Sequence, residues 1–289
     1  MPRLSQYPKI KHAIKFLRWR GRRLHAALKW GIGSLHRSPI VFGNAMPKSG
    51  SHLLTQVLYG LTSIGPFVNP GFPPVNRDES NQPLPDKQIF SNIYGMLPGD
   101  IRYGYIHAKE PFISLLTQPE QTTFFIYRDP RDMLISHIFY ATDLYQEHGM
   151  HAFYAELDSM EARLMVAIEG ISKPLFSISN IRERYESYLG WLEQPEVFSI
   201  RFEDLILEQD VSLARLIGFL EVSGFDLKIS HEQAIQILKA GISPQKSGTF
   251  RKGEPGNWRE YFSEANKVRF KEIAGDLLVR LGYEDGDDW

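Results

Sequence analysis

The chain has 289 residues, of which 43% are hydrophobic and 23% charged, a balance typical of a soluble globular protein large enough for one α/β domain. It has no cysteine, which excludes disulfides, thiolate nucleophiles, iron–sulfur clusters and cysteine-ligated zinc, and suits a cytoplasmic location. The net charge of −1 conceals an asymmetry, because the first 77 residues carry twelve Lys or Arg and no acidic residue.

Residues 1–38 are predicted to form a basic, helical N-terminal extension of a domain over residues 39–289. Apolar residues recur among the basic ones at helical spacing, namely Ile10, Ile14, Leu17, Leu24 and Leu28. Two interpretations stay open. The helix contacts an anionic membrane surface or a partner, or it packs on the acidic body with its basic face in solvent. No apolar run is long enough to cross a bilayer, and no signal peptide is visible.

The rest of the chain alternates predicted strands and helices. Strands are expected at 39–45, 101–108, 122–127 and 197–201, and helices at 52–61, 131–145, 181–192, 211–220 and 264–281. Residues 65–88 are rich in Pro, Gly, Asn and Asp and are expected to form a long surface loop. This alternation predicts the α/β class, with a mostly parallel central sheet flanked by helices.

A first motif, PKSGSHL at residues 47–53, joins the first predicted strand to a helix. Backbone N–H groups at such a helix start point toward a bound anion, and Gly50 lets the backbone approach a phosphate closely. Lys48 adds a positive charge. The lysine precedes the glycine, so this is not the Walker pattern of nucleotide triphosphatases. Taken alone, the turn is equally consistent with a simple helix N-cap.

Two further motifs carry cations next to turns. The run RDPRD at residues 128–132 follows a predicted strand, and Ser136 lies eight residues after Arg128. Arg128 can bind phosphate oxygens with its two-pronged guanidinium group. The run RKGEPGNWR at residues 251–259 begins with two cations and contains two glycines, which is typical of an anion-binding loop. Trp258 is expected to anchor that loop.

In this order, the motifs resemble those of the sulfotransferases that use 3′-phosphoadenosine 5′-phosphosulfate (PAPS). The resemblance implies a P-loop-like sulfotransferase fold, PAPS as co-substrate, adenosine 3′,5′-bisphosphate (PAP) as product, and no metal. It also implies binding roles for the residues of the motifs. The 5′-phosphosulfate group would be bound by Lys48, Ser49, Gly50, Ser51, His52 and Leu53, the 3′-phosphate by Arg128, Ser136, Arg251, Lys252 and Gly253, and the adenine side by Phe202.

An acceptor hydroxyl must lose its proton as it attacks sulfur, and histidine is the usual base near neutral pH. His107 follows a predicted strand, and the resembling family commonly places a catalytic histidine at this strand end. His107 is therefore our predicted base, with His52 and Glu110 as competitors. Lys48 is predicted to neutralise the charge that develops on the leaving phosphate oxygen.

The sequence thus predicts transfer of a sulfuryl group from PAPS to a hydroxyl, amine or carbamoyl group of a small-molecule acceptor, with no nucleic-acid partner. Two alternatives remain at this point. One is a P-loop-like kinase, which would need a Walker lysine and magnesium-binding acids. The other is a catalytically inactive protein of the same fold that binds a membrane or a partner through its basic arm.

Overall fold

The computed structural model describes residues 8–173, 176–246 and 252–289. They divide into two compact units, each built from separate stretches of the chain. Among the described residues, unit 1 comprises those up to 127 and those from 190 to 243, and unit 2 comprises those from 128 to 189 and from 244 onward.

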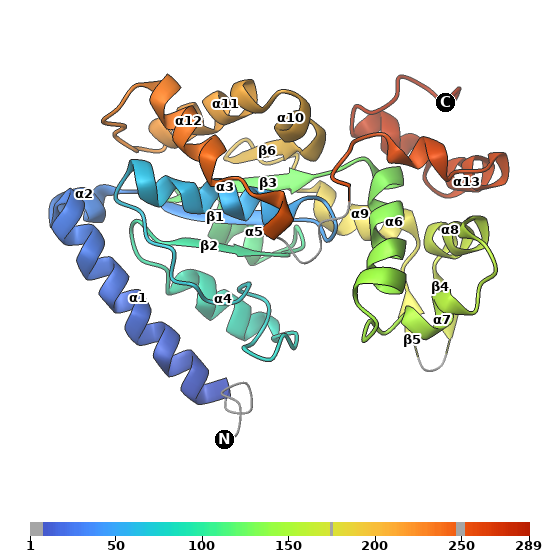
Figure 1. Ribbon diagram of the computed structural model, residues 1–289, viewed down its shortest axis with the longest axis horizontal. Coiled ribbons are helices and arrows are strands. Elements are labelled where there is room, and N and C mark those ends of the chain that lie inside the picture. The colour runs from blue at the N-terminus through green and yellow to red at the C-terminus, as the bar shows by residue number, and fades with distance from the viewer. Residues whose placement is uncertain (1–7, 174–175, 247–251) are drawn as a thin grey trace. The chain divides into compact units, whose positions relative to one another are not determined.

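The centre of unit 1 is a parallel sheet (Figure 1). Its strands, in the order β2-β1-β3-β6, are β2 (Ile101–Gly104), β1 (Ile40–Ala45), β3 (Gln121–Tyr127) and β6 (Val197–Arg201). Asn44 pairs with Gly104 on one side and Phe125 on the other, and Tyr127 pairs with Arg201. Because the strands are parallel, their carboxyl ends meet at one edge, which is where ligands bind in open α/β sheets.

Helices cover the sheet of unit 1, with α11 and α12 above it and α4 below it in Figure 1. The helices are α1 (Pro8–Trp30), α2 (Ile32–Arg37), α3 (Ser51–Ile64), α4 (Asp86–Tyr94), α5 (Phe112–Leu116), α10 (Phe202–Leu207), α11 (Gln209–Val222) and α12 (His231–Gly241). The core lies between α3, α11, α12 and the sheet, and includes fully buried Leu58, Phe124, Leu216 and Leu238. Burial on both faces explains why β1 and β3 are so apolar.

Unit 2 is mainly helical, with one small antiparallel pair of strands. Its elements are α6 (Pro130–Phe139), a π-helix (Tyr140–Leu144), α7 (His151–Ala155), α8 (Met160–Glu169), β4 (Ile171–Lys173), β5 (Phe176–Ile178), α9 (Ile181–Leu189), 3₁₀ turns at Pro244–Lys246 and Asn257–Glu260, and α13 (Glu264–Arg280). Tyr154, Tyr185 and Phe270 are fully buried in it. None of the helices in the described part of the chain is long and apolar enough to cross a membrane.

The predicted α/β class and parallel sheet are confirmed, and several element boundaries differ from the predicted ones. The strand expected over 101–108 ends at Gly104. The helix expected over 131–145 changes to a π-helix at Tyr140, and the one expected over 181–192 ends at Leu189. The sequence predicted none of the helices α4, α5, α7, α8, α10 and α12, nor the strands β4 and β5.

Candidate active site

The segment that joins β1 to α3 has an unusual backbone. Lys48 has φ +66° and Gly50 has φ +92°, both in the left-handed region. A Cβ atom placed on Gly50 would lie 2.5 Å from Cδ2 of Phe202, too close for any side chain. Glycine is therefore required here by conformation and by space. The backbone lies directly on the Phe202 ring, which is buried at the start of α10.

This turn leaves polar groups for an anion. The first hydrogen bond of α3 runs from the Leu54 N–H to the Gly50 carbonyl, at 3.0 Å. The N–H groups of Ser51, His52 and Leu53 therefore have no acceptor within the helix. The Ser49 hydroxyl is buried and has no hydrogen-bond partner among the described residues. A buried polar atom of this kind needs a partner, and a phosphate oxygen would provide one, so the turn fits an anionic donor.

The Ser51 side chain is held by a neighbouring strand end. Its hydroxyl lies 2.9 Å from the hydroxyl of Tyr105, just beyond β2. The Tyr105 N–H donates in turn to Asn76 Oδ1 at 3.2 Å. Burial raises the pKa of Tyr105, so its hydroxyl stays protonated and can donate. Tyr105 was not predicted as a site residue, since nothing in the sequence links it to Ser51.

The peptide before His107 is fixed by two side chains. Asn44, at the carboxyl end of β1, donates to the Ile106 carbonyl at 3.0 Å and accepts the Ile106 N–H at 2.8 Å. The Trp191 indole N–H also donates to that carbonyl, at 2.8 Å. These bonds replace the sheet pairing that β2 loses after Gly104. His107 therefore follows an anchored peptide at the carboxyl edge of the sheet, three residues beyond β2.

The electrostatics of His107 favour the neutral imidazole. The residue is exposed, yet enough protein surrounds the ring that partial burial lowers its pKa, and the Lys109 ammonium lowers it further. Asp86 opposes this, and its carboxylate lies 2.6 Å from Lys109 Nζ. An imidazole with a lowered pKa is unprotonated at neutral pH, which is the state that a general base requires.

The two competing bases differ in their surroundings. His52 lies in the first turn of α3, and burial followed by the Lys48 charge lowers its pKa. The Glu110 carboxylate accepts the hydroxyl of Ser114 at 2.7 Å, so it is engaged at the start of α5. Of these two, His52 is the better alternative to His107 as a base.

In unit 2, Arg128 is the first residue after β3. Its carbonyl accepts the Tyr185 hydroxyl at 2.8 Å, which fixes its backbone. Its Nη2 lies 3.6 Å from Asp132 Oδ2 and 3.4 Å from the Glu254 carbonyl. Ser136 is half-buried two turns along α6. A guanidinium group at this strand end could donate to a phosphate oxygen, which is a strong charged acceptor.

The other arginine of the same motif is committed to the fold. Arg131 is buried, and its Nη2 lies 2.7 Å from Asp129 Oδ2. It also pairs with Glu284. Its guanidinium lies over the rings of Trp258 and Trp289, at 3.9 and 4.6 Å. Every face of this cation is occupied by protein, so its role is structural.

The loop over residues 252–260 is fixed by a buried carboxylate of α6. Asp132 accepts the backbone N–H groups of Gly256 at 2.7 Å and Trp258 at 2.8 Å. Burial raises the pKa of Asp132, while the nearby Arg128 charge opposes that rise. As expected, Trp258 is buried and anchors the loop.

The cations of this loop were predicted to bind the donor. Lys252 is exposed, with its Nζ 3.2 Å from Glu260 Oε2. Gly253 adopts φ +69°, a conformation that glycine allows without strain. Arg251 lies outside the described residues. Within the described ranges, no group of His, Asp and Glu has the arrangement of a metal site.

Two solved structures share this fold. The mouse sulfotransferase SULT7A1, solved with PAP, matches with a TM-score of 0.61 and 17% identity over 89% of this chain and 93% of that one. Retinol dehydratase, solved with androsterone and the inactive cofactor PAP, matches with a TM-score of 0.52 and 17% identity over 85% and 83%. No curated protein sequence matches this chain.

At 17% identity, these structural matches establish the fold alone. The family described as "Sulfotransferase domain" matches residues 112–282, more than half of the chain. That match includes Arg128, Ser136 and Phe202 and begins after the turn at Lys48 and Gly50. The chain belongs to the sulfotransferase family.

Proposed function

We propose that this sulfotransferase moves the sulfuryl group of PAPS to a hydroxyl of a small-molecule acceptor, with amine and carbamoyl groups as the alternative acceptors. One observation carries the proposal, namely the turn that follows β1 at the carboxyl edge of the sheet. It combines Lys48, Gly50 with no room for a side chain, and a buried Ser49 hydroxyl that has no hydrogen-bond partner among the described residues. Both solved structures cited above contain PAP, which supports PAPS as the donor.

The proposed step is an in-line displacement. The acceptor oxygen attacks sulfur while the bond between sulfur and the bridging phosphate oxygen breaks. The acceptor proton passes to the neutral imidazole of His107, and the bond's electron pair leaves on the phosphate of PAP. Lys48 neutralises the charge that develops on that oxygen, and the backbone N–H groups of residues 51–53 hold the 5′-phosphate. Positioning and fixed charges supply the acceleration.

The 3′-phosphate is assigned to the cations of unit 2. Arg128 and Ser136 would bind its oxygens, together with Lys252, Gly253 and the undescribed Arg251. Lys252 would exchange its ion pair with Glu260 for the phosphate, since that pair is exposed and therefore weak. Phe202 is assigned to the adenosine side of the donor. Its ring also packs against Gly50 and so supports the backbone of the anion-binding turn.

Transfer of labelled sulfate from PAPS tests this function. The purified chain is incubated with labelled PAPS and a panel of phenols, aliphatic alcohols, amines and carbamates, with Lys48→Ala as the matched control. We expect labelled product from at least one hydroxyl acceptor and strongly reduced product with the variant. Labelled product from an amine or carbamate alone would correct the acceptor class. No turnover with any acceptor, despite PAP binding, would indicate the inactive alternative.

The kinase alternative is separated by calorimetry. A PAPS enzyme binds PAP without magnesium and binds ATP with magnesium weakly or not at all. A P-loop kinase shows the reverse preference. Preference for ATP with magnesium would overturn the assignment of the donor.

A further inference from the structure

Helix α1 is held firmly along unit 1 by polar contacts on one side. Lys15 Nζ lies 2.6 Å from Glu79 Oε2, and both Trp19 and Arg23 donate to Asp100 Oδ1 at 2.9 Å. Further along the same side, Ala26 is buried. These contacts involve carboxylates outside the helix, since α1 contains no acidic residue. The side of α1 that faces solvent is therefore defined.

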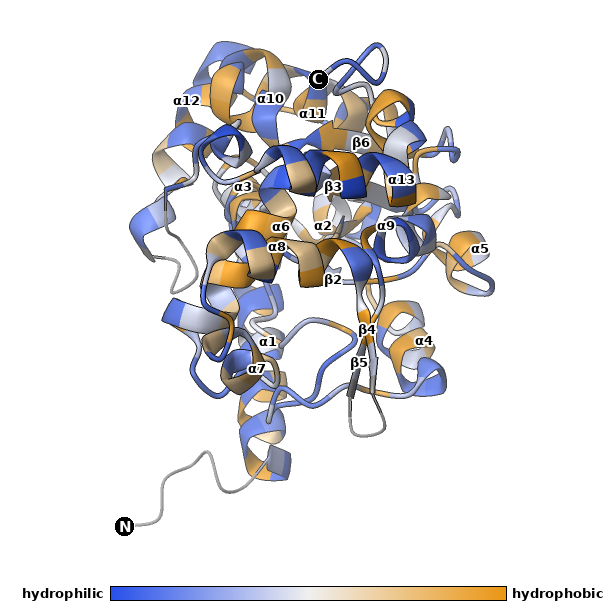
Figure 2. Cartoon of the chain, turned by 90° about the vertical axis from the view of Figure 1, so that its right-hand side faces the viewer, coloured by the Kyte–Doolittle hydropathy of each residue, from blue (hydrophilic) through white to orange (hydrophobic). Residues whose placement is uncertain are grey.

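That outward side is apolar, which is the reverse of the packed-helix interpretation of the sequence. Four large apolar residues on it are exposed: Ile10 at 51%, Leu17 at 68%, Leu24 at 63% and Leu28 at 78%. Their spacing of seven, seven and four residues places them in one stripe along the helix. The stripe runs about 27 Å, at 1.5 Å per residue. Figure 2 shows hydrophobic and hydrophilic residues alternating along α1.

Cations line both sides of this stripe. By helical spacing, Lys9 and Arg20 flank one side and Arg18 and Lys29 flank the other. Arg18 and Arg20 make no hydrogen bond or ion pair with the described part of the chain. An apolar stripe between two rows of cations is the pattern of a helix that lies in a membrane interface, with its apolar side at the acyl boundary and its cations among the headgroups.

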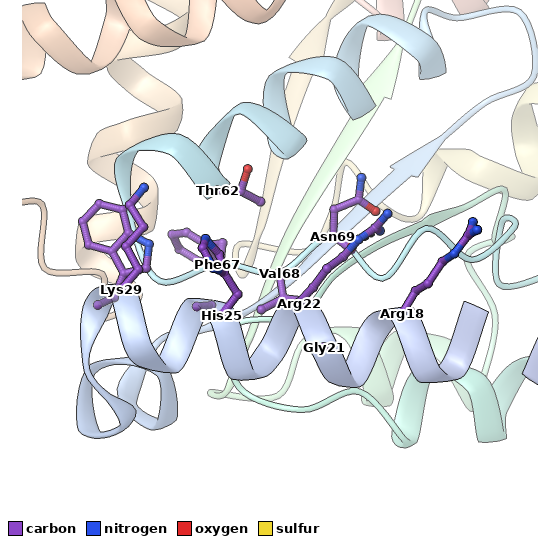
Figure 3. A pocket seen from close by; sticks show the side chains of 11 residues that line it. Arg18, Gly21, Arg22, His25, Lys29, Thr62, Phe67, Val68 and Asn69 are labelled. Atoms are coloured by element: carbon purple, nitrogen blue, oxygen red, sulfur yellow. Dashed lines mark hydrogen bonds between the residues drawn. The ribbon is translucent and has the colours of Figure 1, made fainter. Parts of the chain in front are cut away.

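A groove of about 630 Å³ lies beside the stripe. Figure 3 shows that it runs between α1 and the segment from Thr62 to Asn69. The α1 side carries Arg18, Arg22, His25 and Lys29, and the opposite side includes Phe67 and Asn69. Its floor is apolar, because Phe67 and Val68 are both buried. A cationic rim above an apolar floor is complementary to an anionic lipid headgroup.

We infer that α1 docks this enzyme on a bilayer that contains anionic lipids. The apolar stripe enters the interface, the flanking cations contact anionic headgroups, and the groove binds one of them at its rim. Charge complementarity supports a bilayer, since residues 8–77 offer cations and no carboxylate to it. The long, narrow stripe with cations on both sides fits a plane of headgroups better than a second copy of the chain, which would bring two equally basic helices together.

Vesicle co-sedimentation of the full chain tests this inference. Vesicles of phosphatidylcholine alone are compared with vesicles that also contain about a quarter phosphatidylserine, since anionic headgroups supply the electrostatic part of the binding. We expect binding to the anionic vesicles that weakens as salt is raised, and much weaker binding to the neutral ones.

Two variants separate the stripe from the charges. Leu24→Glu with Leu28→Glu should weaken vesicle binding by about tenfold or more, because it places carboxylates in the apolar stripe. Arg18→Gln with Arg20→Gln should weaken it by roughly twenty-five-fold, at about fivefold for each of the two cations removed. The matched control is Leu207→Glu with Val222→Glu, which changes exposed apolar residues elsewhere in unit 1, at 71% and 87% exposure. Calorimetry of PAP confirms that each variant is folded and competent for the proposed function.

Three outcomes would overturn the inference. They are no binding to anionic vesicles, equal binding to both kinds of vesicle, and binding that the α1 variants and the control weaken alike. Sedimentation velocity tests the alternative that a second copy of the chain covers the stripe, by measuring self-association. Self-association that depends on Leu24 and Leu28, without vesicle binding, would identify the stripe as an interface between copies of the chain.

Discussion

The segment after β1 and the segment after β3 both place cations at turns, but different forces shape them. The first is shaped by its backbone, because Lys48 and Gly50 both lie in the left-handed region and Gly50 packs against the Phe202 ring. The second is shaped by buried charges, with Arg131 surrounded by carboxylates and tryptophans. A cation next to a turn can therefore serve a ligand or the fold, and the contacts around it distinguish the two.

The largest effect is expected from Arg131→Ala. This change leaves the Asp129 carboxylate buried without its cation, and the loss of one partner of a buried pair typically costs about 3–5 kcal/mol of unfolding free energy. Urea denaturation measures it. The control is Arg182→Ala, which removes an ion pair of a much more exposed arginine in the same unit and should cost under about 1 kcal/mol. Equal losses of unfolding free energy in the two variants would contradict the structural role of Arg131.

Lys48→Ala should lower turnover and leave stability unchanged, in contrast to Arg131→Ala. Without the charge beside the leaving oxygen, turnover is expected to fall by a factor on the order of a hundred or more. Stability should be almost unchanged, because the turn is held by Gly50 and Phe202. The control Lys228→Ala removes an exposed lysine paired with Asp226 and should leave both quantities unaffected. Turnover of Lys48→Ala within threefold of the wild type would rule out the role of Lys48.

Arg128→Ala sharpens the contrast within one motif, since Arg128 lies only three residues before Arg131. Loss of a charge-assisted contact should weaken PAP binding by roughly tenfold to a hundredfold. Arg251→Ala tests the second predicted 3′-phosphate ligand in the same way. Binding of adenosine 5′-phosphosulfate, which lacks the 3′-phosphate, should change far less. Equal weakening of both nucleotides would contradict the 3′-phosphate assignment.

The smallest effect concerns pH. Because the pKa of His107 is lowered, the rate should rise with pH through an inflection below the ordinary value of about 6.5. Lys109→Met removes a charge that lowers this pKa and leaves Asp86, which raises it. Loss of the Lys109 charge and the remaining Asp86 charge both raise the pKa of His107. The inflection of the rate against pH should therefore move upward, by less than about one pH unit. A downward shift, or none, would show that His107 is not the titrating base.

Much of the fold could be predicted, because its signals are local. β1 and β3 are short apolar runs, and the turn at Gly50 is marked by its small residues. Helix α12 was missed although its start carries a readable signal, the capping box of Ser230 and Gln233. Helix α4 begins directly after Pro85, within the composition that predicted a loop.

The support of the site could not be predicted, because it comes from residues far apart in sequence. Asn44 fixes the peptide before His107 from 62 positions away, and Tyr105 reaches Ser51 from 54 positions away. The orientation of α1 was hidden for the same reason. Its periodicity located an apolar face, but the carboxylates of Glu79 and Asp100 decide which face packs.

The assignment of chemistry to the carboxyl edge of the sheet is tested most directly by His107→Ala, with turnover, PAP affinity and melting temperature measured on the same preparation. A base acts on the acceptor proton, so kcat should fall by a factor of about 10²–10⁴, while PAP affinity and melting temperature stay close to those of the wild type. His52→Ala is the matched control and should retain most of the turnover. Near-normal turnover in a well-folded His107→Ala enzyme, with loss of turnover in His52→Ala, would contradict the account and move the base to α3.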